Sequence, residues 1–205
     1  MDPYRNPPRG CSLVERVRHT AATIPTRTLG ALAFPGYQAL SLWGPIEVFG
    51  DCAPAIQPLI ITPDGRPAAS AQGPRIQPDA SLQSAPRLDL LLVPGGNIRT
   101  AKENPHLLEW LGSRSSDAEI VMAIGSGIDL LAHTGHLDAR RAATNRSFFP
   151  SARHPDTVDW IEGTPWTTDG RYVTCSRSRA GVDMALGIVA RLLGKDPSDQ
   201  LGAHL

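Results

Sequence analysis

Short apolar runs alternate with segments of helical periodicity along most of this chain. Four mostly apolar runs end at turn-forming residues, which is typical of buried strands in a parallel sheet; they cover residues 27–34, 57–62, 88–94 and 119–124. Helical spacing and helix-start signals predict helices that begin at Gly44-Pro45 and that span residues 104–111, 126–133 and 183–193. Asp169-Gly170 lies between two extended runs and predicts a β-hairpin. The alternation predicts one α/β domain, with a doubly wound, mainly parallel sheet between helices.

Glycine-containing turns follow three of the predicted strands, at Pro35-Gly36, Pro94-Gly95-Gly96 and Gly125-Ser126-Gly127. Ligands of doubly wound sheets bind beyond the carboxyl ends of the strands, so we expect the functional site at these turns. The last of them joins an apolar strand to a helix, which is the layout in which many α/β enzymes present a nucleophile. Its first residue, Gly125, has no side chain that could attack a substrate.

Length and charge limit the classes of function. The chain has 205 residues, of which 41% are hydrophobic, so it is long enough for one domain with a sizeable core. We expect that domain at residues 27–195, with an N-terminal arm at 1–26 and a polar C-terminal tail at 196–205. Twenty basic residues balance twenty acidic ones, so no overall field attracts nucleic acid or an anionic membrane. Because the sequence contains no apolar run of signal-peptide or transmembrane type, we expect a cytoplasmic protein.

The cysteine and histidine residues have no spacing typical of a metal site. Cys11, Cys52 and Cys175 are odd in number and far apart, which fits neither a disulfide framework nor a set of zinc ligands. We therefore expect reduced thiols, no metal ion and no other cofactor.

Four segments occur in an order and spacing that resemble the ThiJ/PfpI superfamily. They are AFPGYQALSLWGPIEVF, LDLLLVPGG, IGSGIDLLAHTGHLDARRAATN and VTCSRSRAGVDMALGIVARLLG, and together they extend over most of the chain. Within the superfamily, the chain is most similar to isonitrile hydratases and to the ligand-sensing half of AraC-type regulators. The resemblance implies a flavodoxin-like fold and a homodimer.

The resemblance also implies a catalytic cysteine in the strand-to-helix turn, but that cysteine falls on Gly125. The threonine beside it falls on Ser126, the supporting acid on Ser41, and the histidine after the following strand on Asn145. Thioester or thioimidate chemistry needs a thiolate, which glycine cannot supply. We therefore expect no cysteine-based hydrolysis, isonitrile hydration or peptidase activity.

Several polar groups remain near the predicted turns. The backbone amides of Gly95, Gly96 and Ser126, with the side chain of Asn97, are candidate donors to an oxygen that develops charge. Glu47, which matches a glutamate of the family pattern, is a candidate general acid or base. The alternative is a structural role, as a first-turn charge of its helix or as a contact between subunits.

Two further groups carry ionisable side chains. Asp129 and His133 share a helix face and could transfer protons near neutral pH, although an ordinary ion pair explains the same spacing. Arg177 and Arg179, in the stretch CSRSR, could hold a carboxylate or phosphate of a ligand, although surface arginines are common.

Three functions agree with these residues. The first is a cofactor-independent enzyme, such as a hydratase, lyase, isomerase or cyclising condensation enzyme, that acts on a small metabolite by proton transfer. The second is a sensor-like protein that binds a small molecule. The third is a pseudoenzyme scaffold. Polar residues around the predicted cleft favour the first two, and we expect a small-molecule substrate or ligand.

Overall fold

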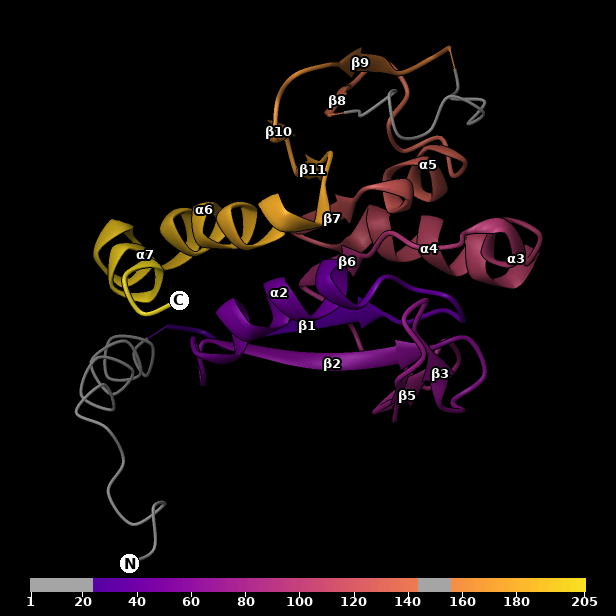
Figure 1. The fold of residues 1–205 in the computed structure, drawn as a ribbon, viewed down its shortest axis with the longest axis horizontal. Coiled ribbons are helices and arrows are strands. Elements are labelled where there is room, and N and C mark those ends of the chain that lie inside the picture. The colour runs from indigo at the N-terminus through magenta and orange to yellow at the C-terminus, as the bar shows by residue number, and fades with distance from the viewer. Residues whose placement is uncertain (1–23, 144–155) are drawn as a thin grey trace, which may run out of the picture.

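The structure is a computed structural model that describes residues 24–143 and 156–205. A seven-stranded sheet crosses the molecule in the order β10-β11-β7-β6-β1-β2-β5 (Figure 1). Its neighbouring strands pair in parallel except for the hairpin β10–β11. The strands are β1 (Arg27–Leu32), β2 (Ile56–Thr62), β5 (Ala80–Ser81), β6 (Leu90–Val93), β7 (Ile120–Ile124), β10 (Trp166–Asp169) and β11 (Tyr172–Cys175). The prediction of a mainly parallel, doubly wound sheet is therefore confirmed.

Helices flank this sheet. α2 packs beside α6, and α4 packs beside α3 and α5. The helices are α2 (Ala39–Gly50), α3 (Arg99–Lys102), α4 (Pro105–Asp117), α5 (Ser126–Ala132), α6 (Gly181–Leu193) and α7 (Lys195–Gly202), with a 3₁₀ turn η1 (Ser178–Ala180) before α6. Two small sheets lie outside the main one, formed by β3 (Ala68–Ala69) with β4 (Arg75–Ile76) and by β8 (Arg141–Ala143) with β9 (Asp159–Ile161).

The central strands form the core. All residues of β6 and β7 are buried, which is the burial expected of strands that are covered on both faces. α4 begins as predicted, because Asn104 Oδ1 accepts a hydrogen bond from Leu107 N at 3.1 Å. The Asp169-Gly170 hairpin is also confirmed, since Asp169 faces Tyr172 across an antiparallel pair. In the part of the chain that the structure describes, no helix is long and apolar enough to span a membrane.

One predicted helix start is wrong. α2 begins at Ala39, so Pro45 lies inside the helix instead of in its first turn. A Cβ atom on Gly44 would lie 3.2 Å from Val182 Cγ2, and one on Gly181 would lie 3.5 Å from Pro45 Cγ. These residues therefore form the close contact between α2 and α6. The Gly44-Pro45 pair, which resembles a helix start in the sequence, is instead the place where α2 packs against α6.

The predicted polar tail at 196–205 is mostly helical. α7 buries Leu201, and Ser198 Oγ donates a hydrogen bond to Leu186 O at 2.8 Å. Most of this segment thus packs against α6. Of the predicted N-terminal arm, residues 1–23 lie outside the described part of the chain.

Candidate functional site

The turn between β7 and α5 holds Gly125 in a conformation that favours glycine. Its φ is +56° and its ψ is −127°. Gly125 N donates to Cys175 O at 2.8 Å, so the turn lies beside the carboxyl end of β11. A Cβ atom built on Gly125 would have Gly95 Cα as its nearest neighbour, at 4.0 Å. The turn therefore avoids the strain that a side chain would bring, and it leaves space where a side chain would stand.

The three predicted turns do meet at one edge of the sheet. Gln38 N donates to Gly95 O at 2.7 Å, and Asn97 N donates to Gly36 O at 2.9 Å. A Cβ atom on Gly127 would lie 2.5 Å from Val93 O, so only glycine allows α5 to start this close to β6. The prediction from the parallel strand order is confirmed for these turns.

Two of the predicted oxyanion donors are already paired. Gly95 N donates to Ser41 Oγ at 3.1 Å, and Gly96 N donates to Ser126 Oγ at 2.9 Å. Both hydroxyls also donate, Ser41 Oγ to Gln38 O and Ser126 Oγ to Gly96 O, each at 2.8 Å. Serine hydroxyls therefore use the Gly95 and Gly96 amides to join the turns together, which gives the predicted oxyanion role no support and leaves it a prediction.

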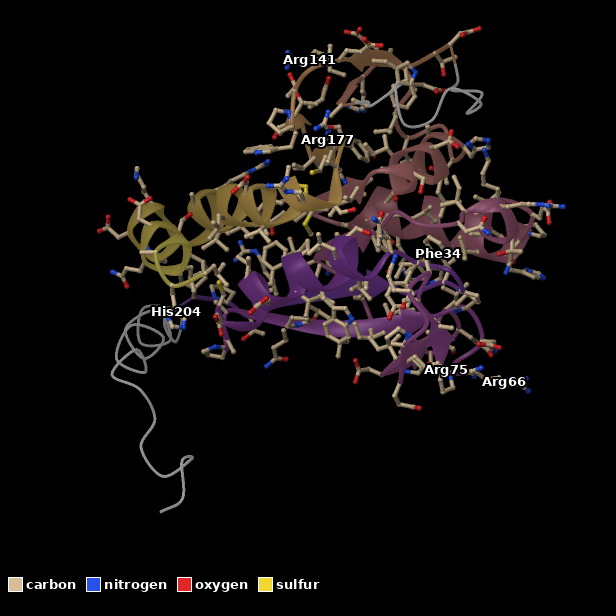
Figure 2. The ribbon with its side chains drawn as sticks, in the orientation of Figure 1. Phe34, Arg66, Arg75, Arg141, Arg177 and His204 are labelled. Carbon is tan, nitrogen blue, oxygen red and sulfur yellow. The ribbon has the colours of Figure 1, made fainter. Side chains whose placement is uncertain are left out.

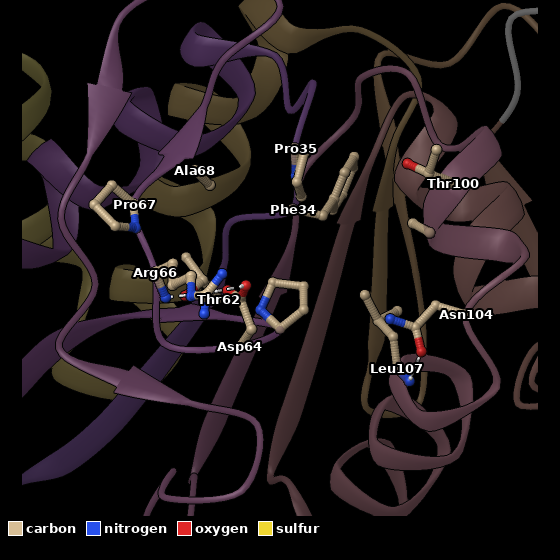
Figure 3. A pocket seen from close by; sticks show the side chains of 12 residues that line it. Phe34, Pro35, Thr62, Asp64, Arg66, Pro67, Ala68, Thr100, Asn104 and Leu107 are labelled. Carbon is tan, nitrogen blue, oxygen red and sulfur yellow. Dashed lines mark hydrogen bonds and ion pairs between the residues drawn. The ribbon is translucent and has the colours of Figure 1, made fainter.

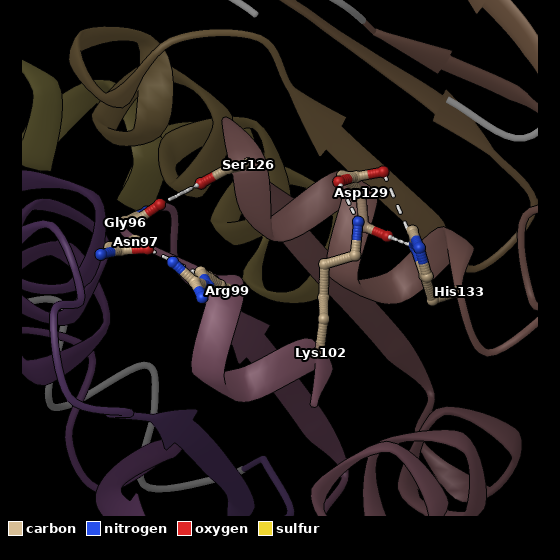
Figure 4. Close-up of polar contacts among 7 residues, drawn as sticks. All are labelled: Gly96, Asn97, Arg99, Lys102, Ser126, Asp129 and His133. Atoms are coloured by element: carbon tan, nitrogen blue, oxygen red, sulfur yellow. Dashed lines mark hydrogen bonds and ion pairs between the residues drawn. The ribbon is translucent and has the colours of Figure 1, made fainter. Parts of the chain in front are cut away.

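Asn97 also has a local contact. Its Oδ1 accepts a hydrogen bond from Arg99 N at 3.3 Å, at the start of α3, and the residue is exposed (Figure 4). This bond shapes the entry into α3. It supports a structural role and leaves the ligand-binding role of Asn97 a prediction.

Asp129, Lys102 and His133 form a polar cluster between α3 and α5 (Figure 4). The Asp129 side chain is 7% exposed, and its Oδ2 lies 3.0 Å from Lys102 Nζ. His133 Nδ1 lies 2.6 Å from the backbone oxygen of Asp129 and 3.7 Å from its Oδ1. Since a carbonyl oxygen only accepts, Nδ1 carries a proton. The i, i+4 spacing predicted the contact between Asp129 and His133.

The sequence did not indicate Lys102. It lies on a helix of four residues, which is too short to show a hydrophobic period. Its ammonium group reaches Asp129 across 27 positions of the chain, and no motif or spacing rule relates the two residues. The contact between Lys102 and Asp129 depends on how α3 lies next to α5, which is visible only in the tertiary structure.

Glu47 lies in the last turn of α2 and is exposed. Its expected position in the first turn of a helix is wrong, because α2 starts five residues before Gly44. The α2 end that meets the Gly95 turn is eight residues away, or about 12 Å along the helix axis. A role of Glu47 as acid or base stays a prediction, and its position gives that role no support.

The stretch that carries Arg177 and Arg179 starts beside Gly125, and both arginines are exposed. Ser176 Oγ donates to Thr164 O at 3.0 Å and to Pro165 O at 3.1 Å, so this hydroxyl holds the preceding loop. The guanidinium groups of Arg177 and Arg179 thus remain the candidate hydrogen-bond donors to an anionic ligand. Asn145 lies outside the described residues.

Cys175 lies beside Gly125 in the fold, since its carbonyl oxygen accepts a hydrogen bond from Gly125 N. Burial raises the pKa of the Cys175 thiol to about 11, and its Sγ donates to Arg177 O at 3.0 Å. A protonated, buried thiol is a poor nucleophile. Among residues 24–143 and 156–205, no three His, Cys, Asp or Glu side chains come together as a metal site.

Known proteins are similar to this chain in sequence and in structure. A model of the DJ-1/PfpI family matches residues 29–191. An isonitrile hydratase of Pseudomonas putida is 28% identical over 181 residues, which are 86% of this chain and 77% of that protein. The HTH-type transcriptional regulator CdhR of Pseudomonas aeruginosa is 24% identical over 135 residues, which are 66% of this chain and 40% of the regulator. A solved ThiJ/PfpI family protein from Pseudomonas syringae has a TM-score of 0.77 at 22% identity, over 98% of this chain and 81% of that one.

Proposed function

Because the chain belongs to the DJ-1/PfpI family, we propose that it binds a small metabolite beside Gly125 and acts on it by proton transfer. The reaction classes that fit are hydration, elimination, isomerisation and cyclising condensation. No covalent bond forms at position 125, since glycine has no side chain, and the chemistry needs no cofactor. The space at the Gly125 turn supports the binding step, because it leaves room for a substrate atom.

The cluster of Asp129, Lys102 and His133 is the observation that carries the proposal. A carboxylate that is 7% exposed, paired with an ammonium group and close to an imidazole, is costly to place in a fold for stability alone. Asp129 acts as the acid or base, while Lys102 holds its carboxylate in place and His133 exchanges the proton with solvent.

Arg177 and Arg179 bind the substrate in this proposal. Both guanidinium groups are exposed, and their stretch begins where Cys175 O accepts the Gly125 amide. Arginine pairs well with carboxylates and phosphates, so an anionic metabolite suits the site. Isonitrile hydration through a thiolate is not part of the proposal, because neither Gly125 nor Ser41 can supply the groups that it requires.

A ligand sensor without catalysis is the second candidate. The hydroxyls of Ser41 and Ser126 occupy the Gly95 and Gly96 amides, which removes two donors that a transition state would use. The similarity to CdhR, a transcriptional regulator, supports the same reading, although it extends over 40% of that protein.

A cytoplasmic homodimer is the setting that we propose for either function. Leu40 and Trp43 are 48% and 46% exposed and lie one turn apart on α2. An exposed apolar pair of this kind suits a contact between two copies of the chain.

Product analysis separates the two candidates. The protein is incubated with a library of small carboxylic and phosphorylated metabolites, and binding is followed by thermal shift while each compound is followed by mass spectrometry. If the protein is an enzyme, a compound that raises its melting temperature is also consumed. Binding with no consumption of any compound supports the sensor and contradicts the enzyme.

A further inference from the structure

A pocket of about 410 Å³ opens at the carboxyl ends of β1 and β2 (Figure 3). One wall comes from the loop after β2, and the other comes from α3 and the start of α4. Its size falls in the usual range of small-molecule sites. None of the site residues predicted from the sequence lines it. The lining residues are Phe34, Pro35, Thr62, Pro63, Asp64, Arg66, Pro67, Ala68, Thr100, Ala101, Asn104 and Leu107.

The lining is mainly apolar. Phe34 and three prolines, with the aliphatic side chains of Ala68, Ala101 and Leu107, supply most of the walls. The exposed rings of Pro35 and Pro67 suit an apolar ligand body. A small, strongly hydrated ion such as free phosphate would leave this surface unused, so the ligand has an apolar part.

Arg66 provides the cation at the rim. Its side chain is 86% exposed and lies 4.0 Å from Asp64 Oδ2, while Asp64 Oδ1 accepts the backbone N–H of Arg66 at 3.0 Å. The carboxylate thus shapes the loop, and the guanidinium group keeps donors for a ligand.

Two polar groups lie further inside. Thr62, the last residue of β2, is buried, and its hydroxyl has no hydrogen-bond partner among the described residues. Asn104 uses its Oδ1 as the cap of α4, so its amide group is held in a fixed orientation on the opposite wall. The pocket therefore combines an apolar interior, a few polar groups and one cation, which is the usual composition of a ligand site.

The short helix α3 separates this pocket from the cluster at Asp129. Thr100 and Ala101 line the pocket, whereas Lys102 points to Asp129 on α5. The pocket is thus a distinct place on the molecule, next to the site of the proposed reaction.

We propose that this pocket binds a small aromatic carboxylic acid. The ring lies against the prolines, and the carboxylate pairs with the Arg66 guanidinium group. Arginine forms paired, charge-assisted hydrogen bonds with a carboxylate, and this pairing distinguishes the acid from its neutral amide.

The experiment titrates benzoate, phenylacetate and indole-3-acetate into ¹⁵N-labelled protein and follows the backbone amides by NMR. We expect at least one acid to shift amides in residues 62–68 and 100–107, with a Kd of about 1 mM. Arg66→Gln weakens that binding by about fivefold or more, whereas Arg75→Gln leaves it unchanged. Arg75 is the matched control because it is an exposed arginine that is not part of the lining (Figure 2). Thr100→Trp, at an exposed position of α3, fills the pocket and removes the shifts.

Any one of four results would overturn the proposal. The first is that none of the acids shifts these amides at about 10 mM, which is ten times the expected Kd. The second is that the shifts lie only at residues 124–128, which would place the acid at the Gly125 turn. The third is that phenylacetamide binds as tightly as phenylacetate. The fourth is that Arg66→Gln and Arg75→Gln weaken binding equally. Either of these would show that the guanidinium group has no specific role.

Discussion

Ser126 Oγ donates to Gly96 O at 2.8 Å and accepts from Gly96 N at 2.9 Å, so one hydroxyl satisfies both backbone groups of a single glycine. This pair joins the start of α5 to the turn after β6. Ser41 makes a similar link from α2 to Gly95. The edge of the sheet that carries the candidate site is therefore held by side-chain hydroxyls as well as by the strand ladder.

Ser126→Ala is expected to lower the free energy of unfolding by about 1 kcal/mol, because it removes the hydrogen-bond partner of the partly buried Gly96 amide. Urea unfolding at neutral pH measures the change. Ser178→Ala is the control, since Ser178 Oγ makes no hydrogen bond within the described residues. Equal stability of the two variants would show that the Ser126–Gly96 pair contributes little.

Two glycine substitutions should differ because the space around them differs. Gly125→Ala has room for its Cβ but carries the strain of φ +56°, so we expect a loss of about 1–2 kcal/mol. Gly127→Ala places a Cβ 2.5 Å from Val93 O, so we expect a loss of more than about 3 kcal/mol or no folding. Denaturant unfolding compares them. A Gly125→Ala variant that is the less stable of the two contradicts the geometry of the turn.

Two buried cysteines should resist alkylation. Burial raises the pKa of Cys52 to about 12 and that of Cys175 to about 11, from 9.0 in each case. At pH 8 the native protein should therefore react with iodoacetamide at these residues far more slowly than the urea-unfolded protein does, as peptide mass spectrometry shows site by site. Comparable rates in the two states would contradict this burial.

The same shifts predict a loss of stability in alkali. The raised pKa values favour the protonated thiols in the folded state, so this contribution is fully present below pH 9 and is lost as the pH rises toward 11 and 12. Urea midpoints measured between pH 8 and pH 11 should fall less for a Cys52→Ala, Cys175→Ala variant than for the native chain. An identical pH dependence would show that the thiols do not contribute to it.

Gly125→Cys should not create isonitrile hydration by itself. The family's supporting acid falls on Ser41, which cannot act as an acid, so the thiolate fraction of the new cysteine stays low. Infrared loss of the isonitrile band follows the reaction, with the Ser41→Asp, Gly125→Cys variant as the comparison. Measurable hydration by the single variant would show that the acid is dispensable.

Sequence patterns predicted the central strands and the meeting of the three glycine turns well, because both depend on local signals. The pure apolar run of β6 and the Asp169-Gly170 hairpin have this character. The start of α2 was not predictable, since Pro45 fits a helix start and a helix contact equally well, and only the approach of Gly181 decides between them.

The chemistry of the site was less predictable than its place. Gly95 and Gly96 were recognised as donors, but the partners of these amides come from Ser41 and Ser126, which are 54 and 30 positions away. Lys102 was missed for the same reason, because its contact with Asp129 is set by the packing of α3. Side-chain partners across a sheet edge depend on tertiary structure, which spacing rules do not describe.

The turnover of Asp129→Asn, measured on the metabolite that the wild-type protein consumes, tests the central claim most directly. Glu109→Gln, which changes an exposed carboxylate on α4, is the matched control, and thermal unfolding checks that both variants fold. The account predicts that Asp129→Asn lowers kcat by about 100-fold or more while Glu109→Gln stays within about twofold of wild type. A folded Asp129→Asn protein with wild-type kcat would contradict it.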